Sequence, residues 1–179
     1  MSFYFQHIDT PLGLMTAVVN DDALLGLSFT DSKDYQTALK HFQKQARLIQ
    51  ISYHPIVNQI ALELEAYFHG HCHTFKTPVA HVIGTPFQQQ VWQALQQLPF
   101  GAVVNYSDIA QMIGRPKSVR AVASAIGQNP LSIIVPCHRV LRKDGQLGGF
   151  NSGLHRKKRL LALEGASLWN NDNLIYFKH

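Results

Sequence analysis

The sequence predicts a mixed α/β protein of two domains, and three observations lead to this fold class. The chain has 179 residues, of which 46% are hydrophobic and 15% charged, so it can bury a sizeable core. Residues 1–30 carry short apolar runs typical of strands, whereas later segments space their apolar residues as helices do. A turn-rich stretch ending near 84–86 separates two groups of elements. We therefore expect domains at 1–84 and 85–168, followed by a tail at 169–179.

The expected N-terminal domain consists of strands followed by helices. The apolar runs at 1–30 predict an antiparallel sheet, with a hairpin turn beginning at Asn20. Apolar residues then recur at spacings of three and four over 33–47 and over 55–69. Pro55 suits the first turn of the second of these helices, because its missing N–H needs no partner there.

The expected C-terminal domain begins with three helices. Apolar spacing predicts them at 86–98, at 108–113 with Ser107 as the N-cap, and at 116–127. The last two are short and joined by a tight turn, as in a helix-turn-helix. Beyond them the sequence predicts a buried strand at 131–136, a flexible loop at 143–149 and a basic helix at 156–164.

Segments that would place the chain in a membrane or outside the cell are not found. No apolar stretch approaches the roughly 18 residues of a membrane helix, and the first ten residues lack the basic start and apolar core of a signal peptide. We expect a cytoplasmic protein with no membrane partner. In a reducing compartment its two cysteines, Cys72 and Cys137, are either core residues or reactive thiols.

Charge is divided unevenly along the chain. Residues 1–100 hold 5 Lys and Arg against 7 Asp and Glu, a net charge of −2, whereas residues 101–179 hold 11 against 4, a net charge of +7. A basic half of this kind favours a polyanion partner, nucleic acid first and an anionic membrane surface second. A solvated basic face explains the charge alone equally well.

The helix expected after Pro116 has one apolar and one small-residue face. At 100° per residue its outer face presents a single charged side chain, Arg120, above a surface of mainly small residues. Such a bare face suits close approach of the backbone to DNA and the shallow minor groove. Taken alone, the motif fits an ordinary surface helix better. Val119, Val122, Ala123 and Ile126 make up the expected inner face, and Arg120, Ala121, Ser124, Ala125 and Gln128 the outer one.

Cys137 is the candidate nucleophile. A thiol with a pKa of about 8.5 is only slightly ionised at neutral pH, so it needs a neighbouring base or positive charge. His138 and Arg139 supply both. Adjacent side chains diverge on a strand, which favours proton transfer through one water. The base would need an orienting carboxylate, and the C-terminal half offers Asp108, Asp144, Glu164 and Asp172. The alternative is a buried structural cysteine.

The motifs of residues 84–164 together resemble the O6-alkylguanine-DNA alkyltransferases of the free-standing bacterial type. These motifs are GTPFQQQVWQAL, PFGAVVNYSDIA, GRPKSVRAVASAIGQNP, IVPCHRV and LLALEG. The resemblance implies a ribonuclease-H-like N-terminal domain, with an antiparallel sheet and helices, and a winged-helix-like C-terminal domain with a helix-turn-helix.

The resemblance also implies roles for the reacting groups. Cys137 matches the acceptor thiol and His138 the histidine that deprotonates it through a water. Glu164 matches the carboxylate that orients the histidine; the alternative is a surface ion pair with Arg156 or Lys157. Asn129 matches the asparagine that braces the turn before the active-site strand. Tyr106 matches the tyrosine whose hydroxyl contacts the flipped guanine.

Two further regions correspond to DNA and base contacts. Arg120 matches the arginine that enters the duplex in place of the everted base, which assigns Ala121, Ser124 and Ala125 to the DNA-facing surface. The Val140 carbonyl and the following loop match the lining of the base pocket. The loop consists of Gly148, Gly149, Phe150, Asn151 and Ser152. Phe150 stands where many relatives have Tyr, and Asn151 where some have Ser, which puts the size of the pocket in question.

The function implied is DNA repair by irreversible transfer of an alkyl group from O6-alkylguanine in double-stranded DNA to one cysteine. O4-alkylthymine is a second candidate substrate. The resemblance implies no cofactor, and we expect a monomer. A non-catalytic binder of alkylated DNA is one alternative, but such proteins replace the acceptor cysteine. A winged-helix regulator is the other, and it leaves Cys137, His138 and Glu164 unexplained.

One histidine-rich segment remains outside this scheme. Alternating histidines in a loop do not by themselves fix the tetrahedral geometry of zinc, so we expect adventitious binding and no structural metal. The candidate ligands are His69, His71, Cys72 and His73.

Overall fold

The computed structural model describes residues 1–169 and 173–175, with side chains described through residue 166. The chain forms two compact units. Unit 1 comprises Met1–Gly84 and Pro130–Ser132, and unit 2 comprises Thr85–Asn129 and the chain from Ile133 onward. Most of the tail expected at 169–179 lies outside the described residues. Within the described part of the chain, no helix is both long and apolar enough to span a bilayer.

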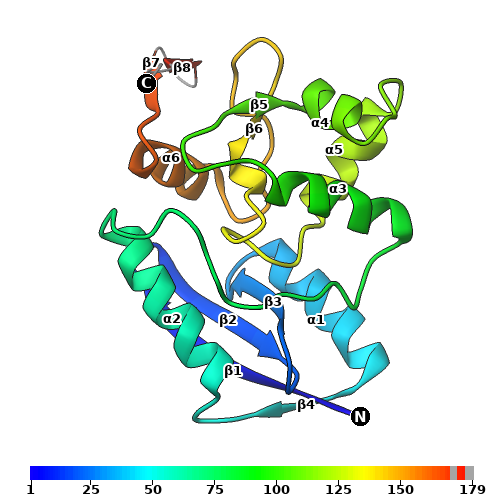
Figure 1. Cartoon of the computed structure of the whole chain (residues 1–179), viewed down its shortest axis with the longest axis vertical. Helices are drawn as coiled ribbons and strands as arrows, with labels where there is room; N and C mark the ends of the chain where they lie inside the picture. The colour runs from blue at the N-terminus through cyan, green and yellow to red at the C-terminus, as the bar shows by residue number, and fades with distance from the viewer. Residues whose placement is uncertain (170–172, 176–179) are drawn as a thin grey trace. The chain divides into compact units, whose positions relative to one another are not determined.

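Unit 1 is built on a four-stranded sheet in the order β3-β2-β1-β4 (Figure 1). β1 pairs antiparallel with β2, and β2 with β3, as the sequence predicts. Asn20 forms the expected turn, since its Oδ1 accepts hydrogen bonds from the Asp22 and Ala23 amides. β4 was not predicted, and it pairs parallel with β1. The strands are β1 (Ser2–Thr10), β2 (Gly13–Val19), β3 (Leu24–Phe29) and β4 (Arg47–Gln50).

Two helices pack on this sheet. α1 (Lys33–Gln45) contacts β3 and β4, and α2 (Pro55–Phe68) contacts β1 and β2. α1 ends two residues earlier than predicted because the chain turns into β4. Every residue of β3 is buried, so both faces of this strand are covered.

Unit 2 begins with three helices that pack on one another, α3 (Pro86–Gln96), α4 (Tyr106–Met112) and α5 (Val119–Gly127). The buried Trp92 of α3 donates its indole N–H to the Ala125 carbonyl of α5 at 2.8 Å. The N-cap of α4 was wrongly predicted. Asn105, not Ser107, caps this helix in a reciprocal capping box with Asp108.

The strand predicted at 131–136 is wrong. Leu131 forms an isolated bridge with Leu27 in unit 1, and the non-glycine residue Ile133 then adopts a φ of +73°. Such a φ ends extended structure, because a β-branched side chain is strained there. The buried apolar run is thus a sharply turning segment, which continues into a 3₁₀ turn at Cys137–Arg139.

Short elements complete unit 2. β5 (Val104–Asn105) pairs parallel with β6 (Val140–Leu141), and β7 (Ser167–Trp169) pairs antiparallel with β8 (Asn173–Ile175). α6 (Leu154–Leu163) is the predicted basic helix. Its Leu161 packs with Leu141 and Leu147, which fixes α6 against β6 and the loop after it.

We predict that Gly26→Ala destabilises unit 1. Gly26 lies in β3, and an added Cβ would be 2.8 Å from Cε2 and 3.0 Å from Cζ of the buried Phe42. The free energy of unfolding should fall by about 1 to 3 kcal/mol, as in other overpacked cores. Chemical denaturation checks this against Gly149→Ala, where an added Cβ meets nothing within 4 Å. Equal stability of the two variants would contradict the prediction.

Candidate active site

Cys137 lies in the 3₁₀ turn that follows the Ile133 bend. It is not in a disulfide, and only 6% of the residue is exposed. The turn is closed by hydrogen bonds from the Arg139 amide to the Pro136 carbonyl and from the Val140 amide to the Cys137 carbonyl. The sequence predicts an extended backbone at Cys137 and His138, and this prediction is wrong. The two residues lie in a tight turn, since β6 begins only at Val140.

Asn129 holds the approach to this turn. It follows α5 and is 2% exposed, and its Nδ2 donates to the Val135 carbonyl at 2.8 Å. Its own amide donates to the Ile126 carbonyl at the end of α5. Asn129 thus connects the end of α5 to the residue two positions before Cys137. The segment between them contains Pro130–Ser132, which belong to unit 1.

A buried carboxylate lies behind the turn. Glu164, just after α6, is 4% exposed, and its Oε1 is 2.9 Å from Nε2 of the fully buried His138. Arg139 donates from Nε to Oε2 and from Nη2 to Oε1, each at 2.8 Å. Its Nη1 donates to the Leu98 carbonyl at 2.6 Å. The surface alternative for Glu164 is therefore wrong, because both its oxygens are engaged in the interior.

The protonation states of His138 and Glu164 follow from these contacts. Burial by itself would raise the pKa of Glu164, but the hydrogen bonds from His138 and Arg139 outweigh it and hold this pKa well below its usual value. The carboxylate can only accept, so His138 Nε2 carries the proton. Burial lowers the pKa of His138, against the opposing effect of Glu164, so the ring is neutral at pH 7. No described residue bonds to the buried Nδ1, which is left as the basic nitrogen.

Tyr106, the first residue of α4, faces the loop that follows β6. A Cβ built on Gly148 would be 3.0 Å from the Tyr106 hydroxyl, and Gly148 has a φ of +70°. Glycine thus permits both the backbone conformation and the close approach of the phenol. Burial raises the pKa of Tyr106, as does the nearby Cys137, while Arg142 lowers it in part. The phenol therefore keeps its proton at neutral pH.

The predicted pocket loop is ordered by polar contacts. The Asn151 side-chain amide donates to the Gly127 carbonyl at the end of α5. The Ser152 carbonyl accepts from Arg156 at 2.9 Å, and Phe150 is half-buried. The Val140 carbonyl accepts from Lys157 at 2.7 Å. The substitution at Asn151 therefore adds a link between the loop and α5.

Lys157 was not among the predicted site residues. The basic run that contains it reads as a surface helix, yet Lys157 is fully buried. Burial lowers its pKa to about 8, and Cys137 partly opposes this shift. Its position three and four residues before the buried Leu160 and Leu161, on one helix face, is the sequence signal that could have identified it.

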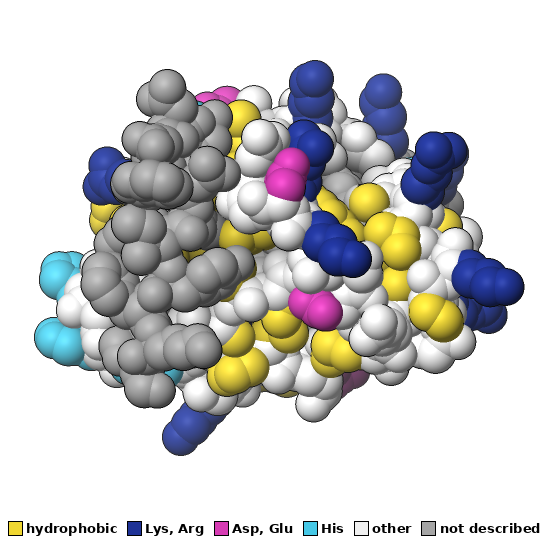
Figure 2. Space-filling view, turned by 90° about the horizontal axis from the view of Figure 1, so that it is seen from above, with side chains coloured by type: hydrophobic (Ala, Val, Ile, Leu, Met, Phe, Trp, Pro, Cys, Tyr) yellow, Lys and Arg dark blue, Asp and Glu magenta, His cyan; other side chains and the backbone are white. Residues whose placement is uncertain are grey.

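The outer face of α5 differs from the predicted one at a single position. Arg120, Ala121 and Ser124 are exposed, as expected. Ala125 is 2% exposed, on the part of α5 that packs with α3, and its backbone carbonyl accepts from the Trp92 indole. Figure 2, a view from above Figure 1, shows several Lys and Arg side chains and few Asp and Glu side chains on the face of the molecule that it presents.

The histidine-rich segment does not form a ligand set. His69 Nδ1 contacts the Glu65 carbonyl at 2.8 Å, and the Cys72 thiol donates to the Thr74 carbonyl at 3.3 Å. Among the residues that the structure describes, no three His, Cys, Asp or Glu side chains are grouped as metal ligands.

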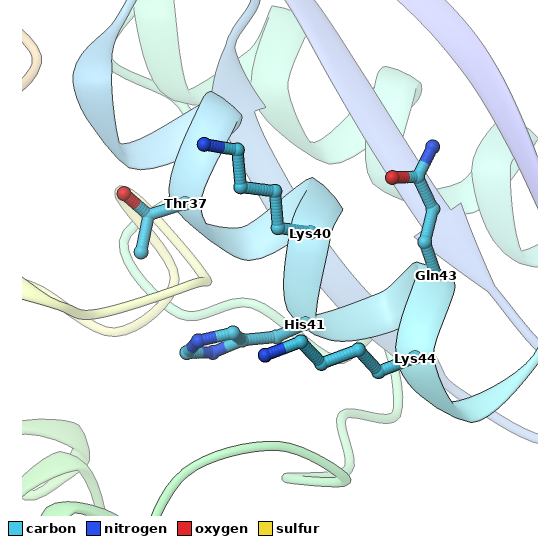
Figure 3. A pocket seen from close by; sticks show the side chains of 5 residues that line it. All are labelled: Thr37, Lys40, His41, Gln43 and Lys44. Carbon is cyan, nitrogen blue, oxygen red and sulfur yellow. The ribbon is translucent and has the colours of Figure 1, made fainter.

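A surface hollow of about 510 Å³ lies along α1 in unit 1. Figure 3 shows the side chains that line it, all from this one helix. None of them is buried, and none is a nucleophile of the cysteine or serine kind. The hollow therefore lacks the desolvated groups expected of a reaction centre. Its lining residues are Thr37, Lys40, His41, Gln43 and Lys44.

Known proteins resemble this chain over nearly its whole length. Residues 86–166 match the family model described as 6-O-methylguanine DNA methyltransferase, DNA binding domain. The methylated-DNA–protein-cysteine methyltransferase of Haemophilus influenzae is 36% identical over 91% of this chain and 87% of its own length. The protein of the same name from Methanosarcina barkeri is 38% identical over 92% of this chain and 99% of its own.

Solved structures agree with this. Mycobacterium tuberculosis OGT in complex with DNA is 34% identical, with 92% of each chain covered and a TM-score of 0.79. The O6-methylguanine-DNA methyltransferase of Pyrococcus kodakaraensis is 25% identical, with 91% of this chain and 99% of that chain covered and a TM-score of 0.60. The predicted fold class is thereby confirmed. Since relatives well above 30% identity match almost end to end, the chain belongs to the methylated-DNA–protein-cysteine methyltransferase family.

Proposed function

We propose that this chain repairs double-stranded DNA by transferring the alkyl group of O6-alkylguanine to Cys137. The observation that carries the proposal is the buried Cys137 beside His138, whose Nε2 is held by the ionised Glu164. Family membership supplies the reaction class. The alternatives of a non-catalytic DNA binder and a winged-helix regulator give this buried set no purpose.

The proton leaves the thiol toward Nδ1 of His138. With Nε2–H held by Glu164, Nδ1 can take the proton through one intervening water, and Glu164 stabilises the imidazolium that forms. Arg139 acts as a positioning residue, because its two bonds to Glu164 keep that carboxylate ionised and fixed. The base is thus neutral before the reaction and charged only as the thiolate appears.

The thiolate then attacks the alkyl carbon. The S–C bond forms as the bond from the alkyl carbon to guanine O6 breaks, and the electron pair passes to the leaving base. Tyr106 offers a protonated hydroxyl that can stabilise this oxygen. The thioether has no bond that water readily cleaves, so each chain acts once. The scheme needs no metal or cofactor, and the same attack could serve O4-alkylthymine.

Access to the lesion requires base eversion, because a stacked guanine cannot present its alkyl group to a buried thiol. We place Arg120 in the duplex at the position of the everted base, with Ala121 and Ser124 allowing α5 to approach the backbone closely. Ala125 packs inside unit 2 and does not take this role. The protein would act as a cytoplasmic monomer on DNA.

The first prediction from the proposed function concerns stoichiometry. After incubation with excess O6-methylguanine duplex, intact-mass and peptide mass spectrometry should find one methyl group per chain, on the Cys137 peptide and not on the Cys72 peptide. Cys137→Ser should bind the duplex but transfer nothing, because a hydroxyl is a much weaker nucleophile at neutral pH. Multiple turnover, or methyl groups on Cys72, would refute the proposed function.

The second prediction concerns the proton relay. Glu164→Gln and His138→Gln should each lower the single-turnover rate at neutral pH at least about tenfold, or roughly 1.4 kcal/mol in the barrier. Raising the pH should restore part of the rate, since the thiol then ionises without help. Rates should be measured in rapid-quench experiments from pH 6 to about 9, a span that brackets the ordinary thiol pKa.

The two variants of the second prediction differ in stability. Glu164→Gln leaves the buried Arg139 without a carboxylate, which should cost about 3 to 5 kcal/mol of unfolding free energy. His138→Gln keeps the Arg139–Glu164 pair and serves as the matched control. If His138→Gln folds and reacts at the unchanged rate, the relay through His138 is wrong.

The third prediction separates eversion from chemistry. Arg120→Ala should slow repair of duplex DNA by about tenfold or more, because eversion costs a few kcal/mol, and leave the reaction with free O6-benzylguanine nearly unchanged. Lys117→Ala removes another exposed cation and is the control for general charge loss. Equal losses with both substrates would place Arg120 in the pocket or the fold instead.

A further inference from the structure

Lys157 is a buried charge that the proposed reaction does not use. It projects from α6, is fully buried and carries no carboxylate partner among its contacts in the described residues. Burying an ammonium group is costly unless its donors are satisfied. Since α6 buries Lys157 despite this free-energy cost, Lys157 is a candidate for a specific role.

Three backbone carbonyls satisfy the ammonium group. Nζ donates to the carbonyls of Val140 at 2.7 Å, of Leu147 and of Gly149 at 3.3 Å. Val140 begins the connection that leaves the active-site turn, and the other two residues lie at its far end. One side chain thus links both ends of the segment 140–149. The Phe150 ring lies next to it, with its centroid 5.9 Å from Nζ.

The segment closed in this way contains the glycine that faces Tyr106. Gly148 lies between two of the three acceptor residues, and its Cα is placed so that a Cβ would come within 3.0 Å of the Tyr106 hydroxyl. Within the segment, the Arg142 amide donates to the Gln146 carbonyl at 2.9 Å, which makes the tip a short closed turn. The position of Gly148 relative to the Tyr106 hydroxyl therefore depends on where the two ends of the segment 140–149 are held.

We propose that Lys157 is a positioning residue that clamps the segment 140–149 and so sets the wall of the base pocket against Tyr106. The role in the pocket rests on the proposed function, whereas the clamp itself does not. A point donor with three protons suits three converging carbonyls, and the planar, forked guanidinium of Arg does not. The pKa of about 8 leaves the group mostly charged at neutral pH.

The clamp can be tested without any alkyl transfer, because Arg142 and Lys143 place exposed trypsin sites inside the segment. In Lys157→Met, cleavage after these residues should be about tenfold faster than in the wild type, at a temperature well below the unfolding midpoint of both proteins. Arg159→Met, an exposed position on the same helix, is the control and should be cleaved at the wild-type rate. Fragment masses assign each cleavage site.

Single-turnover rates then test the role in the pocket. Lys157→Met should react about tenfold or more slowly with both free O6-benzylguanine and O6-methylguanine duplex, since a misplaced pocket wall affects both substrates. Binding of unmodified duplex should not change. This pattern differs from that of Arg120→Ala, which spares the free base. If the segment opens in Lys157→Met but the wild type itself transfers no alkyl group, the clamp stands and the proposed function fails.

A second variant covers the case in which Lys157→Met does not fold. Lys157→Arg keeps the positive charge and should fold, yet show intermediate trypsin sensitivity and an intermediate rate. Wild-type resistance and wild-type rates in Lys157→Arg would overturn the proposal, as would unchanged cleavage in a folded Lys157→Met.

Discussion

The buried carboxylate of Glu164 is the group on which the arrangement of the candidate site depends. It lies in the interior with almost no exposure, and a charge there is tolerated only when strong donors surround it. His138 and Arg139 are consecutive residues, and both bind it. The 3₁₀ turn allows these two neighbours to reach one carboxylate, and the same turn holds Cys137 just before them. The hydrogen bonds to Glu164 therefore anchor the turn and also fix which ring nitrogen of His138 carries the proton.

The segment that leads into this turn shows why Asn129 stands at the end of α5. Its side-chain amide closes the connection by donating to the Val135 carbonyl, which also accepts a hydrogen bond from the Cys137 amide. Between these two residues the chain passes through Pro130–Ser132, whose backbone pairs with Leu27 of β3. Ile133 then bends the chain with a positive φ. The strain of that bend is held by contacts on both sides, as expected where a site requires an unusual backbone geometry.

Two buried charged side chains in unit 2, Glu164 and Lys157, are stabilised by different kinds of partner. Glu164 is paired with a cation and a histidine, so its charge is fixed and its pKa falls. Lys157 is met by carbonyl dipoles and the Phe150 ring, with no carboxylate among its described contacts, so burial lowers its pKa to about 8. The carboxylate binds Nε2 of His138, the residue after Cys137, and the ammonium group binds carbonyls at both ends of the segment 140–149. Both use a charge in a low-dielectric interior to fix the position of backbone or ring atoms.

The sequence by itself predicted the fold class, most helices and the β2–β3 hairpin from apolar periodicity and turn residues, and it predicted Cys137 and His138 as a candidate nucleophile and base. The choice of Glu164 among four carboxylates came from the resemblance to a known family. The predictions made from the sequence were wrong where one local pattern is compatible with two different structures. An apolar run such as 131–136 reads as a strand, and only the bridge of Leu131 to β3 and the bend at Ile133 decide otherwise. Ala125 could face either way on α5 by its spacing, and the structure buries it, with its backbone carbonyl bound by the Trp92 indole.

The tertiary structure alone decided where the long charged side chains end. Arg139 stands two residues after Cys137 in the sequence, yet its guanidinium binds Glu164 and the Leu98 carbonyl. Lys157 lies in a run of basic residues that reads as a solvated face, yet it enters the interior, where three carbonyls of the segment 140–149 satisfy it. A long flexible side chain binds the polar groups that folding brings within its reach, and no periodicity or capping pattern specifies which groups these are.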